Sequence, residues 1–361
     1  MNIVYISWLS GNKSAGLSYS VPVQIESQSK IDKVLWYNLD LNYQQDTDSN
    51  IKCFNSNDYP NFEMNKLPAP FNNPDIVVFE GFYFTTYCKI AKDLKIKGIP
   101  YVIIPRGSLT MDAQSIKKMK KKVANFLFFN KFASNASAIQ YLTKQEYKSS
   151  GEKWNKNVLI IPNGTAKKSK IKVRDSNNSL KGVFIGRLDI YHKGIDLLIK
   201  ACATLRSELI ENNIKIDIYG SDQNGSKRTI KKLIVENNLE EFIFVKDGIY
   251  DIEKENVILN SDFFVLTSRF EGHPMGLIEA LSYGIPCLVT TGTNMAEEIE
   301  LGNAGWRAEI SIESVTGALK RLIYEKNDLI EKGQNAIKVS EKYDWDALAH
   351  KTHQLYRQLT D

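Results

Sequence analysis

Short apolar runs, rich in β-branched and aromatic residues, alternate with stretches of helical periodicity along the chain. Most of these runs lack the regular polar–apolar alternation of a half-exposed strand, so they indicate strands buried on both faces of parallel sheets. Strands alternating with helices predict an α/β fold of doubly wound, Rossmann-like domains. The predicted strands are residues 2–8, Lys33–Leu39, Asp75–Glu80, Pro100–Pro105, Ala138–Leu142 and Val158–Pro162 in a first series, and Gly182–Gly186, Ile214–Gly220, Phe242–Lys246, Asp262–Thr267 and Pro286–Thr290 in a second.

A polar stretch separates the two series of strands. Pro162-Asn163-Gly164-Thr165 is followed by Lys167–Asn178, which is rich in Lys, Ser and Asn and has no apolar periodicity. A chain of 361 residues is long for one ordinary domain, so two are expected. We place an N-terminal Rossmann-like domain at residues 1–165, a C-terminal one at 166–342, and a helix at 343–361 that packs back on the N-terminal domain.

Composition narrows the class of protein only a little. Hydrophobic residues make up 43% and charged residues 25%, which is typical of soluble globular proteins. The N-terminal apolar run has strand length and lacks a basic start, and no apolar run reaches the ~20 residues that span a bilayer, so we expect a cytoplasmic protein. The net charge of +5 is compatible with an anionic ligand or membrane surface. The scattered cysteines, read as small buried apolar residues, are Cys53, Cys88, Cys202 and Cys287.

The most informative segment is Ser268–Leu281, which follows a predicted strand. Ligands of open α/β sheets bind beyond the carboxyl ends of the strands. Gly272 and Gly276 would let the backbone approach such a ligand, and Pro274 suits the first turn of a helix. A helix that begins at this place offers unpaired amides to a phosphate.

Two carboxylates flank that helix start. Glu271 precedes it and Glu279 lies about two turns on, so both can reach one site, where they would accept bonds from sugar hydroxyls. The alternative is structural, because an acid at a helix start is favoured by the helix dipole and Glu279 could be a solvated helix residue.

Two cations follow the strand Gly182–Gly186. Arg187 comes directly after it and Lys193 precedes a helix that begins near Gly194 or Ile195. Held near a strand end, a planar guanidinium and an ammonium could clamp a diphosphate. The alternative is a pair of surface cations in a turn.

Together the two segments resemble retaining glycosyltransferase family 4, of the two-domain GT-B architecture. The pattern is Gly-Arg, a short gap, Lys-Gly-x-Asp-x-Leu, and further on Glu-Gly-x(6)-Glu-Ala-Leu-x-x-Gly-x-Pro. The resemblance is strong across residues 181–291 and weaker at the N-terminus, at Pro162-Asn163-Gly164 and at Tyr343-Asp344-Trp345.

The resemblance implies a role for each matching residue. Arg187 and Lys193 would bind the donor diphosphate, Glu271 the hydroxyls of the donor sugar, and Glu279 the ribose. His273-Pro274-Met275 departs from the family, which more often has Phe-Gly and an aliphatic residue there. The other residues expected at the donor are Gly220, Ile249 in the Gly248–Tyr250 segment that would face the base, Gly272, His273, Pro274, Met275, Gly276 and Leu277.

The N-terminal half carries two further candidates. In the family a glycine-containing loop lies near the donor phosphates, and here Gly11 or Gly16 would serve. Arg106 stands near the place of a family histidine that contacts the donor sugar, within a Pro-Arg-Gly similar to that of a branch involved in bacterial surface polysaccharides. We expect Arg106 in the cleft between the domains; the alternative is an arginine that binds a loop carbonyl.

Residues Ile116–Phe132 read as one basic amphipathic helix, because apolar positions recur at helical spacing and no acid occurs among them. It could dock on anionic phospholipid or on a lipid-diphosphate acceptor; the alternative is a packed helix with a solvated lysine face. His350 and His353 lack a third metal ligand and are expected on the surface of the last helix. The lysines of the proposed contact are Lys117, Lys118, Lys120, Lys121 and Lys122.

The resemblance thus implies a retaining transferase that moves a sugar from a nucleotide-diphosphate sugar, a UDP-sugar, to a lipid-linked or other glycan acceptor. It implies no cofactor and no metal for the chemistry. Three alternatives remain: a nucleotide-sugar epimerase of the same architecture, a non-catalytic nucleotide-sugar binder, and a nucleic-acid-binding protein. The sequence contains no recognisable nucleic-acid-binding module that would support the last of these.

Overall fold

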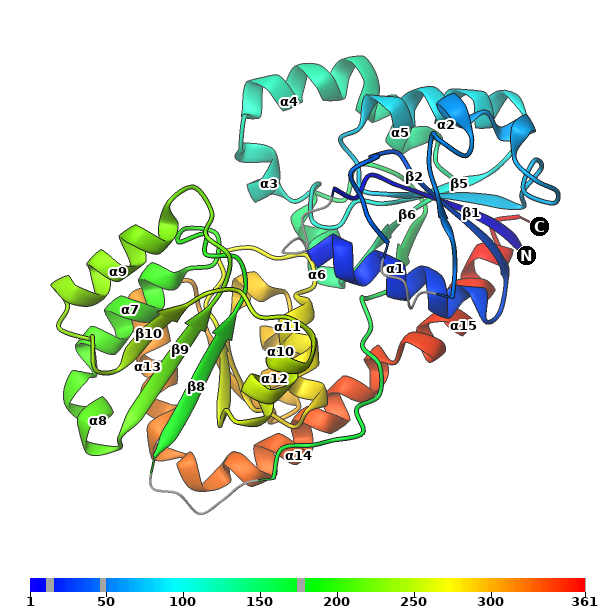
Figure 1. Ribbon diagram of the computed structural model, residues 1–361. Coiled ribbons are helices and arrows are strands. Elements are labelled where there is room, and N and C mark those ends of the chain that lie inside the picture. Colours follow the sequence, from blue (N-terminus) through cyan, green and yellow to red (C-terminus); the bar gives the residue numbers. More distant parts are fainter. Residues whose placement is uncertain (11–15, 46–49, 174–178, 361) are drawn as a thin grey trace. The chain divides into compact units, whose positions relative to one another are not determined.

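The computed structural model describes residues 1–10, 16–45, 50–173 and 179–360. The chain divides into two compact units, unit 1 comprising Met1–Gly164 with Trp345–Asp361, and unit 2 comprising Thr165–Asp344. Each unit is a parallel sheet with helices packed on it, as Figure 1 shows. The predicted α/β fold of two doubly wound domains is confirmed.

The sheet of unit 1 has the strand order β3-β2-β1-β4-β5-β6-β7, and all its pairings are parallel. Its central strands are buried on both faces, because apolar side chains point to both sides and helices cover them. The strands are β1 (Asn2–Ser7), β2 (Lys33–Asn38), β3 (Cys53–Phe54), β4 (Ile76–Glu80), β5 (Tyr101–Ile104), β6 (Ala138–Tyr141) and β7 (Val158–Ile160).

The helices of unit 1 include the last helix of the chain, which packs beside α1. Ser27 Oγ on α1 donates to Asp346 Oδ1 at 2.6 Å, and the Tyr356 hydroxyl donates to Gln140 Oε1 on β6 at 2.6 Å. His350 is exposed, whereas His353 is half-buried and lies 2.8 Å from the buried carboxylate of Asp32. The helices are α1 (Gly16–Ser29), α2 (Thr85–Ile96), α3 (Met111–Ser115), α4 (Lys118–Ala124), α5 (Asn130–Asn135), α6 (Lys144–Ser149) and α15 (Trp345–Arg357).

The helix predicted over Ile116–Phe132 is present from Lys118 to Asn135, so only its first two residues fall outside it. Lys117 has a left-handed backbone (φ 55°), which an α-helix cannot accommodate, so α3 ends before it and α4 begins at Lys118. After α4 the chain makes a π-helical turn, η3 (Asn125–Phe129), before α5. The break at Lys117 lets α3 and α4 project from the body of unit 1 (Figure 1).

The sheet of unit 2 has the order β10-β9-β8-β11-β12-β13 and is parallel throughout. Its strands are β8 (Leu180–Ile185), β9 (Ile214–Tyr219), β10 (Ile243–Lys246), β11 (Phe263–Leu266), β12 (Cys287–Thr290) and β13 (Gly305–Ala308). Its helices are α7 (Ile195–Thr204), α8 (Arg206–Glu211), α9 (Ser226–Glu236), α10 (Asp251–Leu259), α11 (Met275–Ser282), α12 (Ala296–Leu301), α13 (Ile312–Tyr324) and α14 (Leu329–Ser340).

Two strands and two cysteines differ from expectation. The two-residue β3 and the four-residue β13 were not predicted, because each is too short or too polar to form an apolar run. Cys202 and Cys287 are buried as expected, but Cys53 and Cys88 are only half-buried.

Each sheet has one place where the chain reverses its direction of winding. In unit 2 this place lies between β8 and β11, which are neighbours although β9 and β10 separate them in sequence. In unit 1 it lies between β1 and β4. Crevices at the carboxyl ends of such strands bind ligands in open α/β sheets, so these edges position the candidate site.

Candidate active site

The loops that leave β8 and β11 are joined by close backbone packing. Gly194, at the end of the β8 loop, has φ +60°, and a Cβ there would lie 1.9 Å from the carbonyl oxygen of Thr267. The Thr267 hydroxyl donates to the Gly194 carbonyl at 2.8 Å. Gly220, after β9, is packed in the same way, since its Cβ would lie 1.8 Å from the Gly186 oxygen. These glycines are therefore required by packing.

An ion pair bridges the two loops. Lys193 Nζ lies 2.5 Å from Glu271 Oε1, and both side chains are mostly buried (12% and 11% exposed). The Ser268 hydroxyl donates to the same oxygen at 2.6 Å. Burial opposes ionisation of Glu271, but the charge of Lys193 and the hydrogen bonds from Lys193 and Ser268 outweigh it and lower its pKa. The carboxylate is therefore held charged beside the lysine.

His192 completes this cluster. Its ring stacks on Phe270 with the centroids 4.2 Å apart, and Nε2 lies 2.7 Å from the Phe270 carbonyl oxygen. Burial is the largest effect on the ring and lowers its pKa, with the charges of Lys193 and Arg187 acting in the same direction. We assign the neutral tautomer that donates from Nε2 to the carbonyl. The place of this histidine in the site was not predicted from the sequence.

Arg187 is a cation of the site that has no counter-charge among the described residues. Its side chain is half-exposed and makes no hydrogen bond or ion pair with the residues that the structure describes. Its charge acts on His192, which places it near the cluster of Lys193 and Glu271. A positive group held near a strand end without an acid of its own suits a ligand anion.

Helix α11 begins beside the same two strands. Pro274 is its N-cap residue, rather than lying in the first turn as expected, and Met275 is the first helical residue. Gly276 packs closely, since a Cβ there would lie 3.4 Å from the carbonyl oxygen of Ile185, the last residue of β8. Leu277 is fully buried and fixes the turn to the core. The first two amides of α11, those of Met275 and Gly276, have no acceptor within the helix and lie near the end of β8, whereas the Leu277 amide donates to the Pro274 carbonyl at 3.1 Å.

The loop before α11 is held by Asn294, a residue whose role the sequence does not predict. Asn294 has a left-handed backbone (φ 60°), and its Nδ2 donates to the carbonyls of Glu271 at 2.5 Å and Gly272 at 3.2 Å. The Thr290 hydroxyl donates to the Ser268 carbonyl at 2.5 Å. The segment after β12 therefore holds the backbone that carries Glu271.

Glu279 is buried on α11, and its carboxylate is paired. Oε2 lies 2.5 Å from Lys254 Nζ on α10, at ion-pair distance but without hydrogen-bond geometry, and neither oxygen accepts a hydrogen bond from a described residue. Such a carboxylate has lone pairs to offer to hydroxyls. Ile249, just before α10, is buried.

His273 points into the protein. Its ring is 5% exposed and packs against Tyr343, with the centroids 4.9 Å apart. Burial, assisted by the charge of Lys342, lowers its pKa to about 3. The ring is therefore neutral at ordinary pH and acts as a core side chain.

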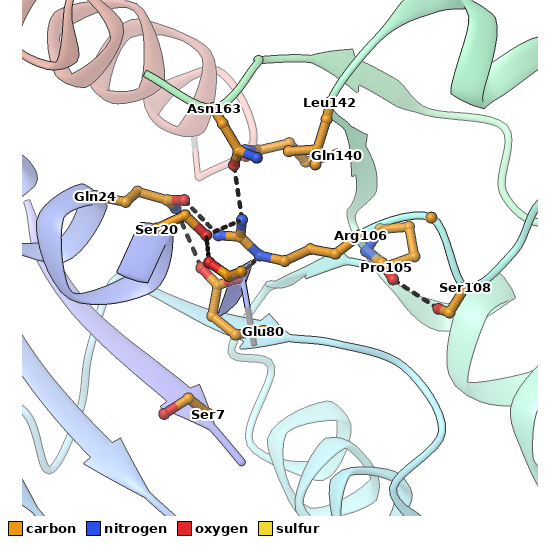
Figure 2. A network of polar contacts seen from close by, with 12 residues as sticks. Ser7, Ser20, Gln24, Glu80, Pro105, Arg106, Ser108, Gln140, Leu142 and Asn163 are labelled. Carbon is orange, nitrogen blue, oxygen red and sulfur yellow. Dashed lines mark hydrogen bonds and ion pairs between the residues drawn. The ribbon is translucent and has the colours of Figure 1, made fainter. Parts of the chain in front are cut away.

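Arg106 in unit 1 lies inside a buried polar network, which Figure 2 shows. Its Nε donates to Glu80 Oε2 at 2.7 Å, and the side chains are 5% and 1% exposed. Its other amino groups donate to Gln24 Oε1 at 2.6 Å, Asn163 Oδ1 at 2.8 Å and Ser20 Oγ at 3.2 Å. The guanidinium is thus engaged by four side chains, and a ligand would have to displace them.

The backbone at Arg106 is left-handed (φ 50°), which is unfavourable for a residue with a long side chain. The turn is held from the other side by Glu146, which is fully buried and accepts from the Gly107 amide at 2.5 Å and the Leu142 amide at 2.7 Å. Burial raises the pKa of Glu146 in spite of these bonds.

Of the two glycines expected near the donor phosphates, Gly16 lies in the described part of the chain and Gly11 does not. Gly16 is the exposed first residue of α1, and a Cβ there would meet no atom within 4 Å. Gly11 lies outside the described residues.

No helix among residues 1–10, 16–45, 50–173 and 179–360 is long and apolar enough to cross a membrane. The same part of the chain holds no group of three or more His, Cys, Asp or Glu side chains placed to share a metal ion.

Known proteins similar to this chain match unit 2 most specifically. Residues 166–343 match the model of the family "Glycosyl transferases group 1". This segment is a group 1 glycosyl transferase domain. It contains Arg187, Lys193, Glu271, Asn294 and Glu279, so the charged cluster at β8 and β11 belongs to that domain.

A curated relative supports a glycosyltransferase beyond the group 1 domain. An uncharacterized glycosyltransferase of Methanocaldococcus jannaschii is 25% identical over 257 residues, which are 70% of this chain and 68% of the relative. Alignments with two further curated relatives span 56% and 51% of their lengths.

Solved structures show that the group 1 domain and unit 1 together have the GT-B fold. Sucrose-phosphate synthase of Thermosynechococcus elongatus matches with a TM-score of 0.77 at 17% identity, over 99% of both chains. Anabaena HepE in complex with UDP matches with a TM-score of 0.74 at 15% identity, over 99% of this chain and 100% of that chain. The predicted GT-B architecture is confirmed.

Proposed function

We propose that this chain is a retaining glycosyltransferase that moves a sugar from a UDP-sugar to a lipid-linked or other glycan acceptor. One observation carries the proposal: a buried Lys193–Glu271 ion pair lies where β8 and β11 meet in a group 1 domain, beside the first turn of α11. The site offers fixed positive charge to a diphosphate and a carboxylate to a sugar.

The chemical step builds negative charge on the leaving diphosphate. Lys193, Arg187 and the leading amides of α11 would stabilise that charge without reorganising, which is the most effective form of electrostatic catalysis. Arg187 has no counter-charge among the described residues and is available as it stands. Lys193 would exchange Glu271 for a phosphate oxygen when the donor binds.

This exchange would free Glu271 to bind the donor sugar. Once Lys193 turns to the phosphate, the charged carboxylate is left beside the donor sugar, whose hydroxyls would donate to it. Asn294 holds the loop backbone in place, so the carboxylate stays where the sugar lies. The same logic assigns Glu279 to the ribose hydroxyls, with Lys254 as its partner before the donor binds.

Retention of configuration is proposed to arise by attack on the same face that the diphosphate leaves. A double displacement needs a second carboxylate ~5–5.5 Å from an acid partner, on opposite sides of the bond. Glu271 is instead bound by Lys193 and Ser268, which suits a hydroxyl acceptor better than a nucleophile. The leaving phosphate would then take the proton of the acceptor hydroxyl.

Separate observations bear on the donor base and on the acceptor. UDP is bound in the HepE structure that shares the fold, which favours a UDP-sugar here. The Pro105-Arg106-Gly107 segment, similar to that of a surface-polysaccharide branch, favours a lipid-linked glycan acceptor in bacterial polysaccharide synthesis. The lysines around α4 would bring the enzyme to an anionic membrane surface from the cytoplasmic side.

The proposal is tested by donor binding followed by turnover. UDP-, GDP- and ADP-sugars are screened for thermal stabilisation of the chain, and turnover is then measured with a membrane lipid extract as acceptor. We expect one UDP-sugar to stabilise the chain and to release UDP when lipid is added. Lys193→Ala and Glu279→Ala should abolish most turnover, whereas Lys200→Ala, an exposed lysine of α7, should not. Unchanged turnover in the first two variants would overturn the assignment.

A further inference from the structure

Helix α4 exposes an unusual amount of apolar surface. None of its residues is buried, although most helices bury an apolar stripe against the protein. The exposed fractions are 72% for Met119 and 56% for Val123 in α4, and 82% for Phe126 and 57% for Leu127 in η3, which continues it. A surface of this kind marks a place where something else docks.

The side of the segment that faces unit 1 is set by three residues at a spacing of four. Lys121 Nζ lies 5.1 Å above the Tyr83 ring and donates to the Ala113 carbonyl at 2.5 Å. The Tyr83 hydroxyl donates to Asn125 Oδ1 at 3.1 Å, and Phe129 packs on the same ring with the centroids 4.9 Å apart. Lys121 therefore faces the protein. Of the five lysines expected to contact a membrane, it is the one that unit 1 binds instead.

The opposite side carries the apolar residues in one row. Met119, Val123, Phe126 and Leu127 follow the spacing i, i+4, i+7 and i+8, which places them on one helical face. At about 100° per residue, Lys118 and Lys122 fall on one flank of that row and Lys120 on the other.

The charge of the segment is of one sign. No acidic residue occurs between Asp112 and Glu146. The row is thus apolar in the middle and basic on both edges, which complements a surface that is apolar inside and anionic outside. A second copy of the chain would bring lysines against lysines, which is unfavourable.

We propose that the outer face of α4 and η3 inserts into an anionic lipid surface, with Met119, Val123, Phe126 and Leu127 entering the headgroup boundary. Lys118, Lys120 and Lys122 bind the phosphates around them. The proposal refines the membrane contact of the proposed function by adding an inserted apolar row and removing Lys121. Amphipathic helices bind membranes through these two contributions together.

Co-sedimentation of the full chain with vesicles tests this. Phosphatidylcholine vesicles with and without phosphatidylglycerol are compared, and we expect binding only where the anionic lipid is present. Phe126→Ser/Leu127→Ser and Lys118→Glu/Lys122→Glu should each weaken it at least about tenfold. The matched controls Ile96→Ser and Lys89→Glu/Lys92→Glu alter exposed residues of α2 and should change it little.

Each other outcome contradicts a stated part of the proposal. Unchanged binding of Phe126→Ser/Leu127→Ser would remove the insertion and leave only surface attraction. Equal binding to neutral vesicles would exclude the anionic partner. A dimer in solution that Phe126→Ser dissolves, with vesicle binding unchanged, would assign the row to a second copy. Stabilisation by the donor without vesicles should be the same in all variants, so failure here is separate from failure of the catalytic proposal.

Discussion

Lys193 and Glu271 are 78 positions apart in the sequence, yet Nζ and Oε1 lie 2.5 Å apart because their loops leave the neighbouring strands β8 and β11. Both side chains are mostly buried, so each charge depends on the other. Under the proposed function, a donor diphosphate would compete with Glu271 for the lysine. The competition would keep the site neutral until a ligand arrives.

Removing Lys193 should show separately its effect on stability, as the partner of Glu271, and its effect on turnover, as a partner of the diphosphate. Lys193→Ala leaves the buried Glu271 charge without its partner, so we expect a loss of about 3 kcal/mol in the free energy of unfolding. Turnover should fall by about 10²–10³-fold, the usual effect of losing one group that stabilises transition-state charge. Thermal melts and UDP release measure the two effects.

The double variant Lys193→Ala/Glu271→Gln is the control. It should recover most of the stability, because the buried charge is gone, but it should recover no turnover. Recovery of turnover would mean that Lys193 only neutralises Glu271 and does not act on the donor.

Asn294 should position the loop before α11, which carries Glu271, without taking part in the reaction itself. Asn294→Gly keeps the left-handed backbone accessible but removes both bonds to the carbonyls of Glu271 and Gly272. We expect donor affinity, measured by calorimetry, to fall about tenfold, since two hydrogen bonds of ordinary strength are lost and the loop is freed. Asn238→Gly, at another left-handed asparagine of unit 2, is the control and should keep full affinity.

Much of this arrangement could be predicted from the sequence because it is local. Buried parallel strands are continuous apolar runs, so most strands were found, whereas β3 has two residues and no run. Lys193 and Glu271 stand out because they follow such strands.

The missed residues depend on contacts between distant segments. Asn294 matters because its left-handed backbone aims Nδ2 at the loop before α11, which no local pattern reveals. Nothing in the segment around Arg106 shows that Glu80, Gln24, Ser20 and Asn163 converge on it, so this network could not be predicted.

His273 should make unfolding sensitive to acid. Its pKa is about 3 in the folded protein against 6.5 without burial, so the unfolded chain binds a proton at a higher pH than the folded one. Stability is then complete above pH 6.5 and falls as the pH drops towards 3, by about 2–3 kcal/mol near pH 4.5. His273→Phe should lose this part of the pH dependence of denaturant unfolding. An identical pH slope in both proteins would contradict it.

The Arg106–Glu80 pair should act on the stability of unit 1. Arg106→Met leaves the buried Glu80 without its ion-pair partner, so we expect a loss of about 3–5 kcal/mol in the free energy of unfolding, and Arg106→Met/Glu80→Leu should restore part of it. Donor binding by the group 1 domain should be unchanged in the folded double variant. A donor affinity lowered tenfold in that variant, at full stability, would show instead that Arg106 reaches the donor.

The most direct measurement is a crystal structure of the full chain soaked with UDP. We predict the diphosphate at the carboxyl ends of β8 and β11, with Lys193 Nζ and the Arg187 guanidinium at about 2.7–3.2 Å from its oxygens and Glu271 released from the lysine. UDP bound elsewhere, with the Lys193–Glu271 pair intact and Arg187 turned to solvent, would contradict the proposed function.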